Sequence, residues 1–249
     1  MGLFKDLIFS LHMRHRFLRY RYRTERFDLE QLCKLPIQGG VALDIGANKG
    51  IFSYWISKTV GNSGLVYAFE PQPEMLTHLN RLKSIFNLEQ LSIKPVGLSS
   101  KAGELSLYRN FAGDGGASLI NTTGKDQIIA VPITTLDDCF SDSPPKNLQL
   151  IKMDVEGHET SVITGGVNLI KQHRPILMIE CSLPQKTDQQ IAEILKPMGY
   201  EVFFLDTGRA ICQDKIRETP NPDRDISNRN LWFCPSEKLP HFFPDMKIR

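Results

Sequence analysis

From residue 36 onward, short apolar runs alternate with amphipathic segments along the chain. The runs are bounded by Gly, Pro, Asn or Asp and have the length and composition of buried strands. They cover Gly40–Ile45, Leu65–Phe69, about Leu91–Val96, Leu148–Val155, Pro175–Cys181, Glu201–Leu205 and Leu231–Cys234. Helical spacing is found in Ile51–Val60, in a segment opened by Pro71 and Pro73 that runs to about Phe86, before Gly165 and Gly166, and in Gln189–Lys196. This alternation predicts an α/β fold whose mostly parallel sheet is covered by helices on both faces.

The alternation is interrupted between the third and fourth of these strands. Leu105–Arg109 and Ile128–Ile133 have strand composition and predict a hairpin or insertion. Between them, the loop Asn110–Lys125 is polar and rich in glycine. A loop of this length and composition is either a flap that closes over a bound acceptor or an ordinary surface excursion.

Residues 1–27 have the most uneven charge in the chain, and we separate a helical segment, 1–35, from the main domain, 36–249. The basic residues of this segment are Lys5, Arg14, Arg16, Arg19, Arg21, Arg23 and Arg26, against Asp6 and Glu25. Apolar residues gather near its start, at Leu3, Phe4, Leu7, Ile8 and Leu11. They are too few to span a bilayer, and they precede the basic residues, the reverse of a secretory signal. The segment is therefore either a surface helix on anionic lipid, giving peripheral membrane contact, or a solvated helix packed on the domain.

Composition limits the class of protein. The chain has 249 residues, of which 41% are hydrophobic and 23% charged, with a net charge of +2. This balance fits a globular protein and argues against nucleic acid as the main partner, since a phosphate-binding surface needs a strong basic excess. Five scattered cysteines without C-x-x-C pairs indicate reduced thiols. We therefore expect a cytoplasmic protein, with any membrane contact on the cytoplasmic face.

The turn DIGANKG, residues 44–50, follows the first predicted strand. Glycine at such a turn lets the backbone approach a ligand closely, but a dinucleotide site wants G-x-G-x-x-G, and only Gly46 and Gly50 are present. Asp44 at the strand end suits a cofactor with an ammonium group, and Glu70 after the second strand suits two ribose hydroxyls. The set favours S-adenosylmethionine over NAD. The alternative is that an acid at a strand end only caps a helix.

A second set of polar residues follows the predicted strand Leu148–Val155. Asp154, Glu156 and His158 lie there, and Glu180 ends the next strand. Parallel strand ends meet at one edge of a sheet, so these groups suit a general base for a hydroxyl or amine. Asp154 and Glu180 are also candidate oxygen ligands for a divalent metal. The alternative is that Glu156 or His158 makes a structural hydrogen bond, and that Glu159 only favours a helix N-terminus.

These motifs together resemble the FkbM family of S-adenosylmethionine-dependent methyltransferases. The resemblance rests, in chain order, on VALDIGANKGIFSYWISK, GLVYAFEPQPEMLTHLNRL, KPVGLSS, ITTLDDC, LIKMDVEGHETSVITGG, RPILMIECS and the closing LWFCP. It implies a Rossmann-like class I methyltransferase fold, with a seven-stranded sheet and a reversed last strand, and methyl transfer, usually to a hydroxyl.

The resemblance also implies roles for particular residues. Asp44, Gly46, Asn48 and Gly50 would line the methionine end of the cofactor, and Glu70, followed by Pro71, its ribose. Asp154, Glu156 and His158 would face the acceptor, with Asp154 or His158 as base and a metal as an optional aid. The expected acceptor is a small molecule or glycan, with a hydroxyl on a carbohydrate, a glycolipid or another natural product.

Three other classes of protein compete with this interpretation. An NAD-dependent oxidoreductase would need the third glycine that the turn lacks. A nucleic-acid methyltransferase would be expected to show an N/D-P-P-Y/F signature, which Ser143–Lys146 does not match. A non-catalytic binding protein could retain every motif as scaffold. Acceptor specificity is expected in the polar segment 208–230, which carries no readable motif.

Overall fold

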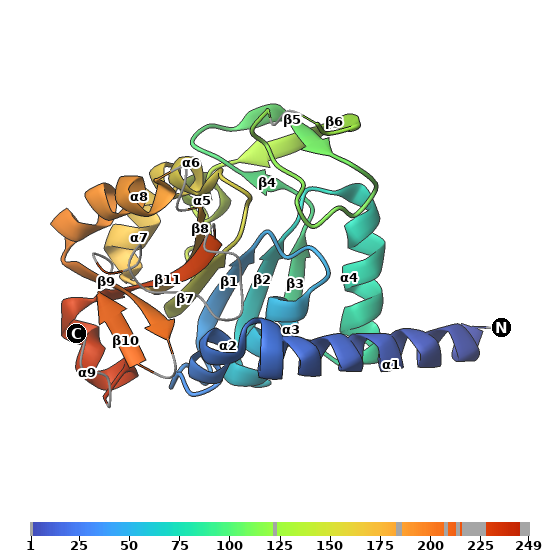
Figure 1. The fold of residues 1–249 in the computed structure, drawn as a ribbon, viewed down its shortest axis with the longest axis horizontal. Coiled ribbons are helices and arrows are strands. Elements are labelled where there is room, and N and C mark those ends of the chain that lie inside the picture. The colour runs from blue at the N-terminus through green and yellow to red at the C-terminus, as the bar shows by residue number, and fades with distance from the viewer. Residues whose placement is uncertain are drawn as a thin grey trace.

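The computed structural model describes residues 2–121, 124–182, 186–206, 209–212, 215 and 228–244. It has a large twisted sheet with helices on both faces and a small second sheet above it (Figure 1). Most of the segment expected to set acceptor specificity, 208–230, lies outside the described residues.

The large sheet has eight strands in the order β10-β9-β11-β8-β7-β1-β2-β3. Their bounds are β1 Val41–Ile45, β2 Leu65–Phe69, β3 Leu91–Lys94, β7 Leu148–Met153, β8 Ile176–Ser182, β9 Tyr200–Asp206, β10 Arg209–Cys212 and β11 Asn228–Pro235. The five strands β8, β7, β1, β2 and β3 pair in parallel with their neighbours. β11 lies antiparallel between β8 and β9. The reversed last strand is thus confirmed.

The sequence prediction of seven strands missed β10. This strand has only four residues and pairs antiparallel with β9 at the edge of the sheet. Only three of its residues are apolar and only Ala210 is buried, which is too short for the apolar run that identified the buried strands.

Two hydrophobic clusters cover the two faces of the sheet because successive strand residues point to opposite sides. Ala42 and Leu150 belong to one cluster, whereas Leu43 and Ile151 belong to the other. The first face is covered by α1 Gly2–Arg19, α2 Arg26–Leu32, α3 Ile51–Val60, α4 Pro73–Ile85 and α9 Leu239–Phe242. The second is covered by α5 Leu136–Cys139, α6 Glu159–Thr164, α7 Val167–His173 and α8 Thr187–Leu195. The predicted coverage of both faces is confirmed.

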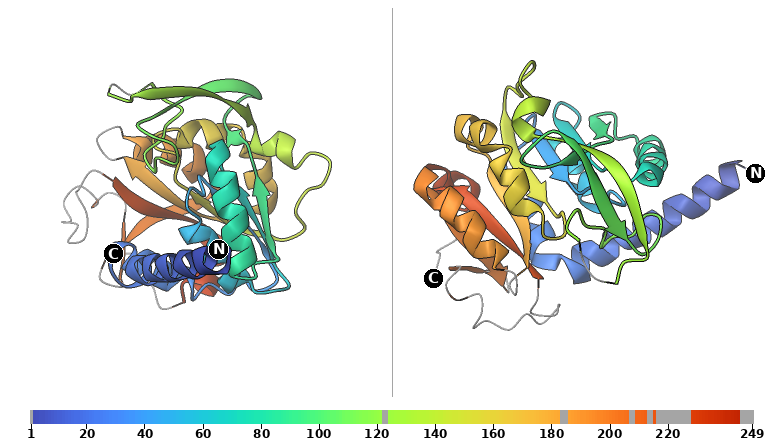
Figure 2. Two further views of the ribbon diagram at one scale, coloured as in Figure 1. Left: turned by 90° about the vertical axis from the view of Figure 1, so that its right-hand side faces the viewer. Right: turned by 90° about the horizontal axis from the view of Figure 1, so that it is seen from above.

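A hairpin forms the small sheet. β5 Gly103–Arg109 pairs antiparallel with β6 Gln127–Thr134, and β6 pairs in parallel with the short β4 Gly97–Leu98. The predicted hairpin is therefore present. It lies across the end of the large sheet where the site residues gather, and Figure 2 shows it from above.

The N-terminal segment packs on the first face of the sheet. Its two α-helices, α1 and α2, are joined by a π-helix, η1 Tyr20–Thr24. Phe17 is buried and stacks on Tyr54 with ring centroids 3.8 Å apart. Trp232 Nε1, on β11, donates a hydrogen bond of 2.7 Å to Asp28. Residues 1–35 thus share the hydrophobic core of the main domain.

Candidate functional site

Two glycines shape the turn that follows β1. Gly46 has a φ of 78°, and a Cβ at this position would lie 1.8 Å from the backbone oxygen of Asp154. Only glycine permits both the left-handed backbone and this contact with the end of β7. Gly50, with a φ of 73°, precedes α3, and a Cβ there would lie 2.9 Å from Leu79 Cδ2. The two glycines therefore let the turn pack between β7 and α4.

Asp44, the acid that precedes this turn, lies beneath it. Its side chain is fully buried and accepts a hydrogen bond of 2.5 Å from Ser53 Oγ on α3. Burial raises the pKa of Asp44, while Lys152, whose Nζ lies 3.9 Å from Oδ1, acts in the opposite direction. Asp44 is not among the residues that line the two cavities described below. Its contact with a cofactor stays a prediction, and its contribution in this geometry is to support the turn.

Glu70 joins the β1 turn to the start of α4. One carboxylate oxygen accepts a hydrogen bond of 2.8 Å from the Asn48 N–H, and the other accepts one of 2.9 Å from the Gln72 N–H. Burial raises the pKa of Glu70, although these two donors favour its charged form. Each carboxylate oxygen keeps a lone pair for a further donor. Glu70 is thus fixed in the lining of a pocket and can accept a further hydrogen bond there.

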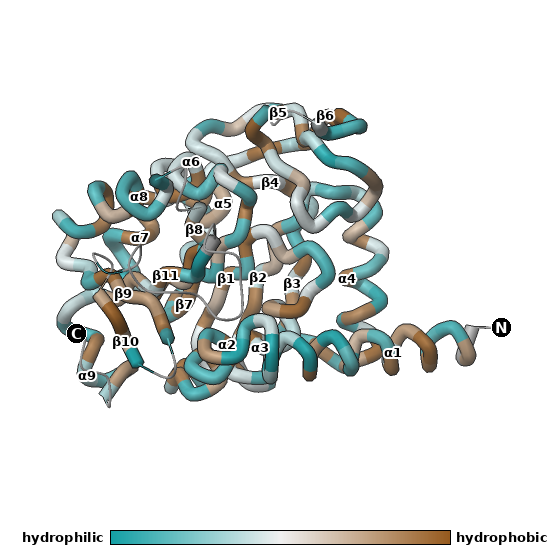
Figure 3. Tube along the Cα trace, viewed as in Figure 1, coloured by the Kyte–Doolittle hydropathy of each residue, from teal (hydrophilic) through white to brown (hydrophobic). Residues whose placement is uncertain are grey.

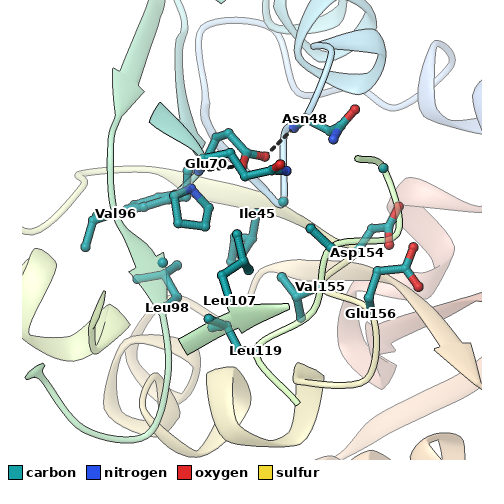
Figure 4. Close-up of a pocket in the computed structure, with 17 residues that line it drawn as sticks. Ile45, Asn48, Glu70, Val96, Leu98, Leu107, Leu119, Asp154, Val155 and Glu156 are labelled. Atoms are coloured by element: carbon teal, nitrogen blue, oxygen red, sulfur yellow. Dashed lines mark hydrogen bonds between the residues drawn. The ribbon is translucent and has the colours of Figure 1, made fainter. Parts of the chain in front are cut away.

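The pocket beside Glu70 is mostly apolar (Figure 4). Its apolar lining comes from Ile45, Phe69, Val96, Leu98, Leu107, Leu119 and Val155, with Pro71 beside them. Leu107 and Leu119 come from β5 and the loop that follows it. An apolar slot next to a fixed carboxylate suits a flat heterocycle attached to a sugar that carries hydroxyl groups.

The loop after β5 lies over this pocket. The Asp114 carbonyl oxygen accepts hydrogen bonds from Asn48 Nδ2 at 3.3 Å and Gln72 Nε2 at 3.1 Å. On its far side, Ser118 Oγ donates to the Glu156 carbonyl oxygen at 2.8 Å. Its residue Gly115 lines both cavities. The loop therefore lies where a flap over a bound ligand would lie.

A second cavity, of about 450 Å³, adjoins the first. It falls within the size range of small-molecule sites. The two cavities share Gly46, Asn48, Gly115, Asp154 and Glu156. The carboxylates of its lining include Asp154, Glu156 and Glu180, whereas Arg16, Tyr20 and Thr24 enter from the N-terminal segment. Three of the sequence-predicted acids are therefore brought together.

Lys152 lies between Asp44 and Asp154, and the sequence analysis did not identify it as a site residue. Its Nζ lies 3.6 Å from Asp154 Oδ2, and its side chain is almost fully buried. Burial disfavours the charge on Lys152, but the nearby carboxylates of Asp154 and Asp44 outweigh it and raise the pKa. The only sequence signal was a lysine placed two residues before Asp154 within a mostly apolar strand.

Glu180 holds a proton under ordinary conditions. Burial raises its pKa to about 9, helped by the charge of Asp154 and by a hydrogen bond to the Asp154 side chain. With its proton, Glu180 donates that hydrogen bond and Asp154 accepts it. Lys152 and Glu180 together orient the Asp154 side chain.

Of the other two residues predicted to face the acceptor, Glu156 lines both cavities and His158 lines neither. Glu156 has a left-handed φ of 53°, and burial together with the charge of Asp154 raises its pKa to about 7. His158 is not among the residues that line either cavity, and its Nε2 hydrogen-bonds Ser99 Oγ at 2.9 Å. This geometry matches the structural alternative for His158 and gives no support to its role as base. Glu159, at the start of α6, accepts the Gly157 N–H at 3.0 Å.

The donor set does not fit a divalent metal. Among the described residues, no group of three His, Cys, Asp or Glu side chains is placed to hold one. The Lys152 ammonium lies 3.6 Å from Asp154 and already supplies a positive charge beside this side chain. No metal enters the proposals below.

The buried proton on Glu180 predicts a dependence of stability on pH. The pKa of Glu180 rises from 4.5 to about 9 on folding, so folding takes up a proton between these values and stability falls as pH rises across them. In Glu180→Gln the amide can still donate a hydrogen bond to Asp154, and folding no longer requires the uptake of a proton at this position. We expect a melting temperature about 2 °C or more above wild type at pH 8 and a smaller gain at pH 5.

Differential scanning calorimetry at the two pH values measures this effect. Glu193→Gln, an exposed position on α8, removes a carboxylate elsewhere and serves as the matched control. A gain for Glu180→Gln that is equal at pH 5 and pH 8 would contradict the buried proton.

Comparison with known proteins gives a family for this fold and site. Residues 44–202 match the Methyltransferase FkbM domain family. The chain is 28% identical over 151 residues to the hexuronic acid methyltransferase AglP of Haloferax volcanii, covering 60% of this chain and 59% of that protein. It is 26% identical over 189 residues to the 2-O-methyltransferase NoeI of Sinorhizobium fredii, covering 70% of this chain and 74% of that protein.

Solved structures agree on the fold. The methyltransferase FkbM from Methylobacillus flagellatus superposes with a TM-score of 0.54 at 18% identity, over 80% of this chain and 44% of that chain. An rRNA methylase from Streptococcus thermophilus superposes with a TM-score of 0.51 at 10% identity, over 86% and 96%. This chain thus spans less than two thirds of some of its relatives. The family match covers more than half of the chain, and the chain belongs to the FkbM methyltransferase family.

Proposed function

We propose that the protein transfers a methyl group from S-adenosylmethionine to a hydroxyl group of an acidic carbohydrate, free or linked to lipid. The observation that supports this most directly is the shared wall of the two cavities. Asp154 and Gly46 line both the pocket beside Glu70 and the larger cavity. A donor in the first and an acceptor in the second would therefore meet at Asp154.

The residues around the first pocket fit the proposed cofactor. Glu70 would accept hydrogen bonds from the ribose hydroxyls. The apolar side chains that line the pocket, among them Val96, Leu98 and Val155, would cover the adenine. The turn at Gly46 and Asn48 would hold the methionine end. When bound, the cofactor supplies a methyl group that is already activated for displacement. The protein then has to align the acceptor and exclude water.

Asp154 is the proposed base. An alcohol must lose its proton as its oxygen attacks, and a positioned carboxylate can take that proton. Asp154 lies at the junction of the cavities, with Lys152 3.6 Å away and Glu180 donating a hydrogen bond to it. Lys152 and Glu180 would orient the Asp154 side chain. The proton from the acceptor would pass to Asp154, which would release it to solvent as the product leaves.

Positive charge in the same cavity supports an acidic acceptor. Arg16 and Lys49 line it together with the acids. Arg16 Nε is buried and has no hydrogen-bond partner among the described residues. A carboxylate on the acceptor would satisfy it. Two of the relatives are named as methyltransferases of a hexuronic acid and of a 2-O position, which agrees with a sugar hydroxyl as the target.

Glu70→Ala tests the cofactor assignment. We expect wild-type protein to bind S-adenosylmethionine and its demethylated product, and the variant to lose about 30-fold or more in affinity, since two charge-assisted hydrogen bonds are removed. Isothermal titration measures both, with NAD as the competing ligand. Because Glu70 also accepts two backbone N–H groups, a melting curve must show that the variant is folded. Binding of NAD in place of the sulfur compounds would overturn the assignment.

The acceptor is tested separately. Methyl transfer from labelled cofactor would be compared for oligosaccharides that contain a uronic acid and for their carboxyl-reduced neutral counterparts. We expect transfer to the acidic series. Cofactor binding without transfer to any acceptor would favour the non-catalytic binding protein, and preference for the neutral series would contradict the role of Arg16 and Lys49.

A further inference from the structure

Helix α1 has one face packed against the protein. Met13 and Phe17 are fully or almost fully buried on this face. Phe9 packs on the His78 ring at 5.1 Å between centroids, and Asp6 forms an ion pair of 2.8 Å with Arg81 on α4. These contacts fix α1 on the protein. Asp6, the only acidic residue of α1, is paired with Arg81 of α4.

The opposite face carries an exposed apolar stripe. Phe4, Leu7, Ile8, Leu11 and Leu18 are between 52% and 68% exposed. At about 100° per residue, these positions fall within a narrow arc on the side away from Met13 and Phe17. Figure 3 shows apolar positions alternating with polar ones along α1, and Figures 1 and 2 show that this helix projects beyond the body of the protein. Scattered exposed apolar residues are ordinary, but an aligned stripe on one helix indicates a partner.

Basic residues flank the stripe. On the same helical wheel, Arg14 falls on one side of it, and Lys5 and Arg19 fall on the other. With Asp6 paired to Arg81, the exposed face of α1 carries the apolar stripe, which His15 interrupts, and basic residues lie along both of its edges. This is the arrangement of a helix that lies in the interface of an anionic membrane, with basic side chains reaching the headgroups.

We propose that α1 docks the protein on a membrane that contains anionic lipid, through the stripe of Phe4, Leu7, Ile8, Leu11 and Leu18. The proposed contact is peripheral, and no helix among the described residues has the length and apolar character needed to cross a bilayer. The docking helix also supplies Arg16 to the larger cavity, and η1 supplies Tyr20 and Thr24. The segment proposed to bind the membrane therefore also forms part of the acceptor cavity of the proposed function.

Co-sedimentation with vesicles tests the proposal. We expect wild-type protein to sediment with vesicles of phosphatidylcholine and phosphatidylglycerol, and to sediment much less with pure phosphatidylcholine or in 1 M salt. The double variant Leu7→Glu/Leu11→Glu should lower the partition coefficient at least about 10-fold. The matched control Phe111→Glu/Ile128→Glu adds the same charge at exposed apolar positions on the insertion, and it should bind like wild type.

Three results would overturn the proposal. One is wild-type protein that stays in the supernatant with every vesicle. Another is equal loss of binding in the control variant, which would make the effect one of net charge. The third is a dimer in sedimentation velocity that only the Leu7→Glu/Leu11→Glu variant disrupts, which would assign the stripe to a second copy of the chain. Melting curves and cofactor titration of each variant report folding and the proposed function independently of lipid binding.

Discussion

Asp154→Asn should lower the rate of methyl transfer by at least about 100-fold, the usual contribution of a positioned base. The amide keeps the size of the side chain but cannot take a proton from the acceptor. Asp154 also lines the first pocket, but the ribose and adenine contacts are assigned to Glu70 and the apolar side chains there, so cofactor affinity should change by no more than a few fold. Single-turnover assays with saturating cofactor, beside isothermal titration, separate the two effects.

The control for this experiment is Asp142→Asn, an exposed position in the loop before β7. It removes a carboxylate at the opposite end of the strand that leads to Asp154. Near wild-type rates in Asp154→Asn would reject its role as base. A loss of cofactor binding equal to the loss of rate would instead assign Asp154 to the cofactor.

Gly46→Ala is expected to damage both folding and binding. Alanine is strained at a φ of 78°, and its Cβ would lie 1.8 Å from the Asp154 carbonyl oxygen, so the β1 turn and the end of β7 must separate. We expect a loss of about 3 kcal/mol or more in the free energy of unfolding. Urea unfolding measures this loss, and titration with S-adenosylmethionine should show that whatever protein folds has lost affinity.

Gly115→Ala is the matched control for this substitution. Gly115 also lines both cavities, but a Cβ there would meet nothing within 4 Å. The control should lose less than about 1 kcal/mol. Similar stability of the two variants would show that the close approach at Gly46 does not hold the turn in place.

The fold was largely predictable because its signal is local. Buried parallel strands leave continuous apolar runs such as Ile176 to Ile179, and the glycines of the β1 turn mark a backbone conformation that other residues rarely adopt. Site residues at strand ends, such as Asp154, Glu156 and Glu180, follow from strand order alone. The short edge strand β10 has no such run and was missed.

The remaining parts of the site depend on contacts between distant segments. In the sequence, Lys152 is one of two polar residues in a mostly apolar strand, and only the structure shows that it lies between Asp44 and Asp154. Arg16 belongs to a segment whose position on the sheet no local pattern specifies. For His158 the sequence allowed both a base and a structural hydrogen bond, and only the position of Ser99 separates them.

The loop over the first pocket bears on the rate at which ligands exchange. The pocket beneath it has a volume of about 60 Å³, room for only a few water molecules, and an adenine with its ribose is larger. We therefore expect the pocket to widen when the proposed cofactor enters or leaves, with release of the hydrogen bonds that the Asp114 carbonyl oxygen accepts from Asn48 and Gln72. These contacts would then slow association and dissociation alike. Weakening them by Gln72→Ala would speed turnover wherever product release, rather than methyl transfer, is the slow step.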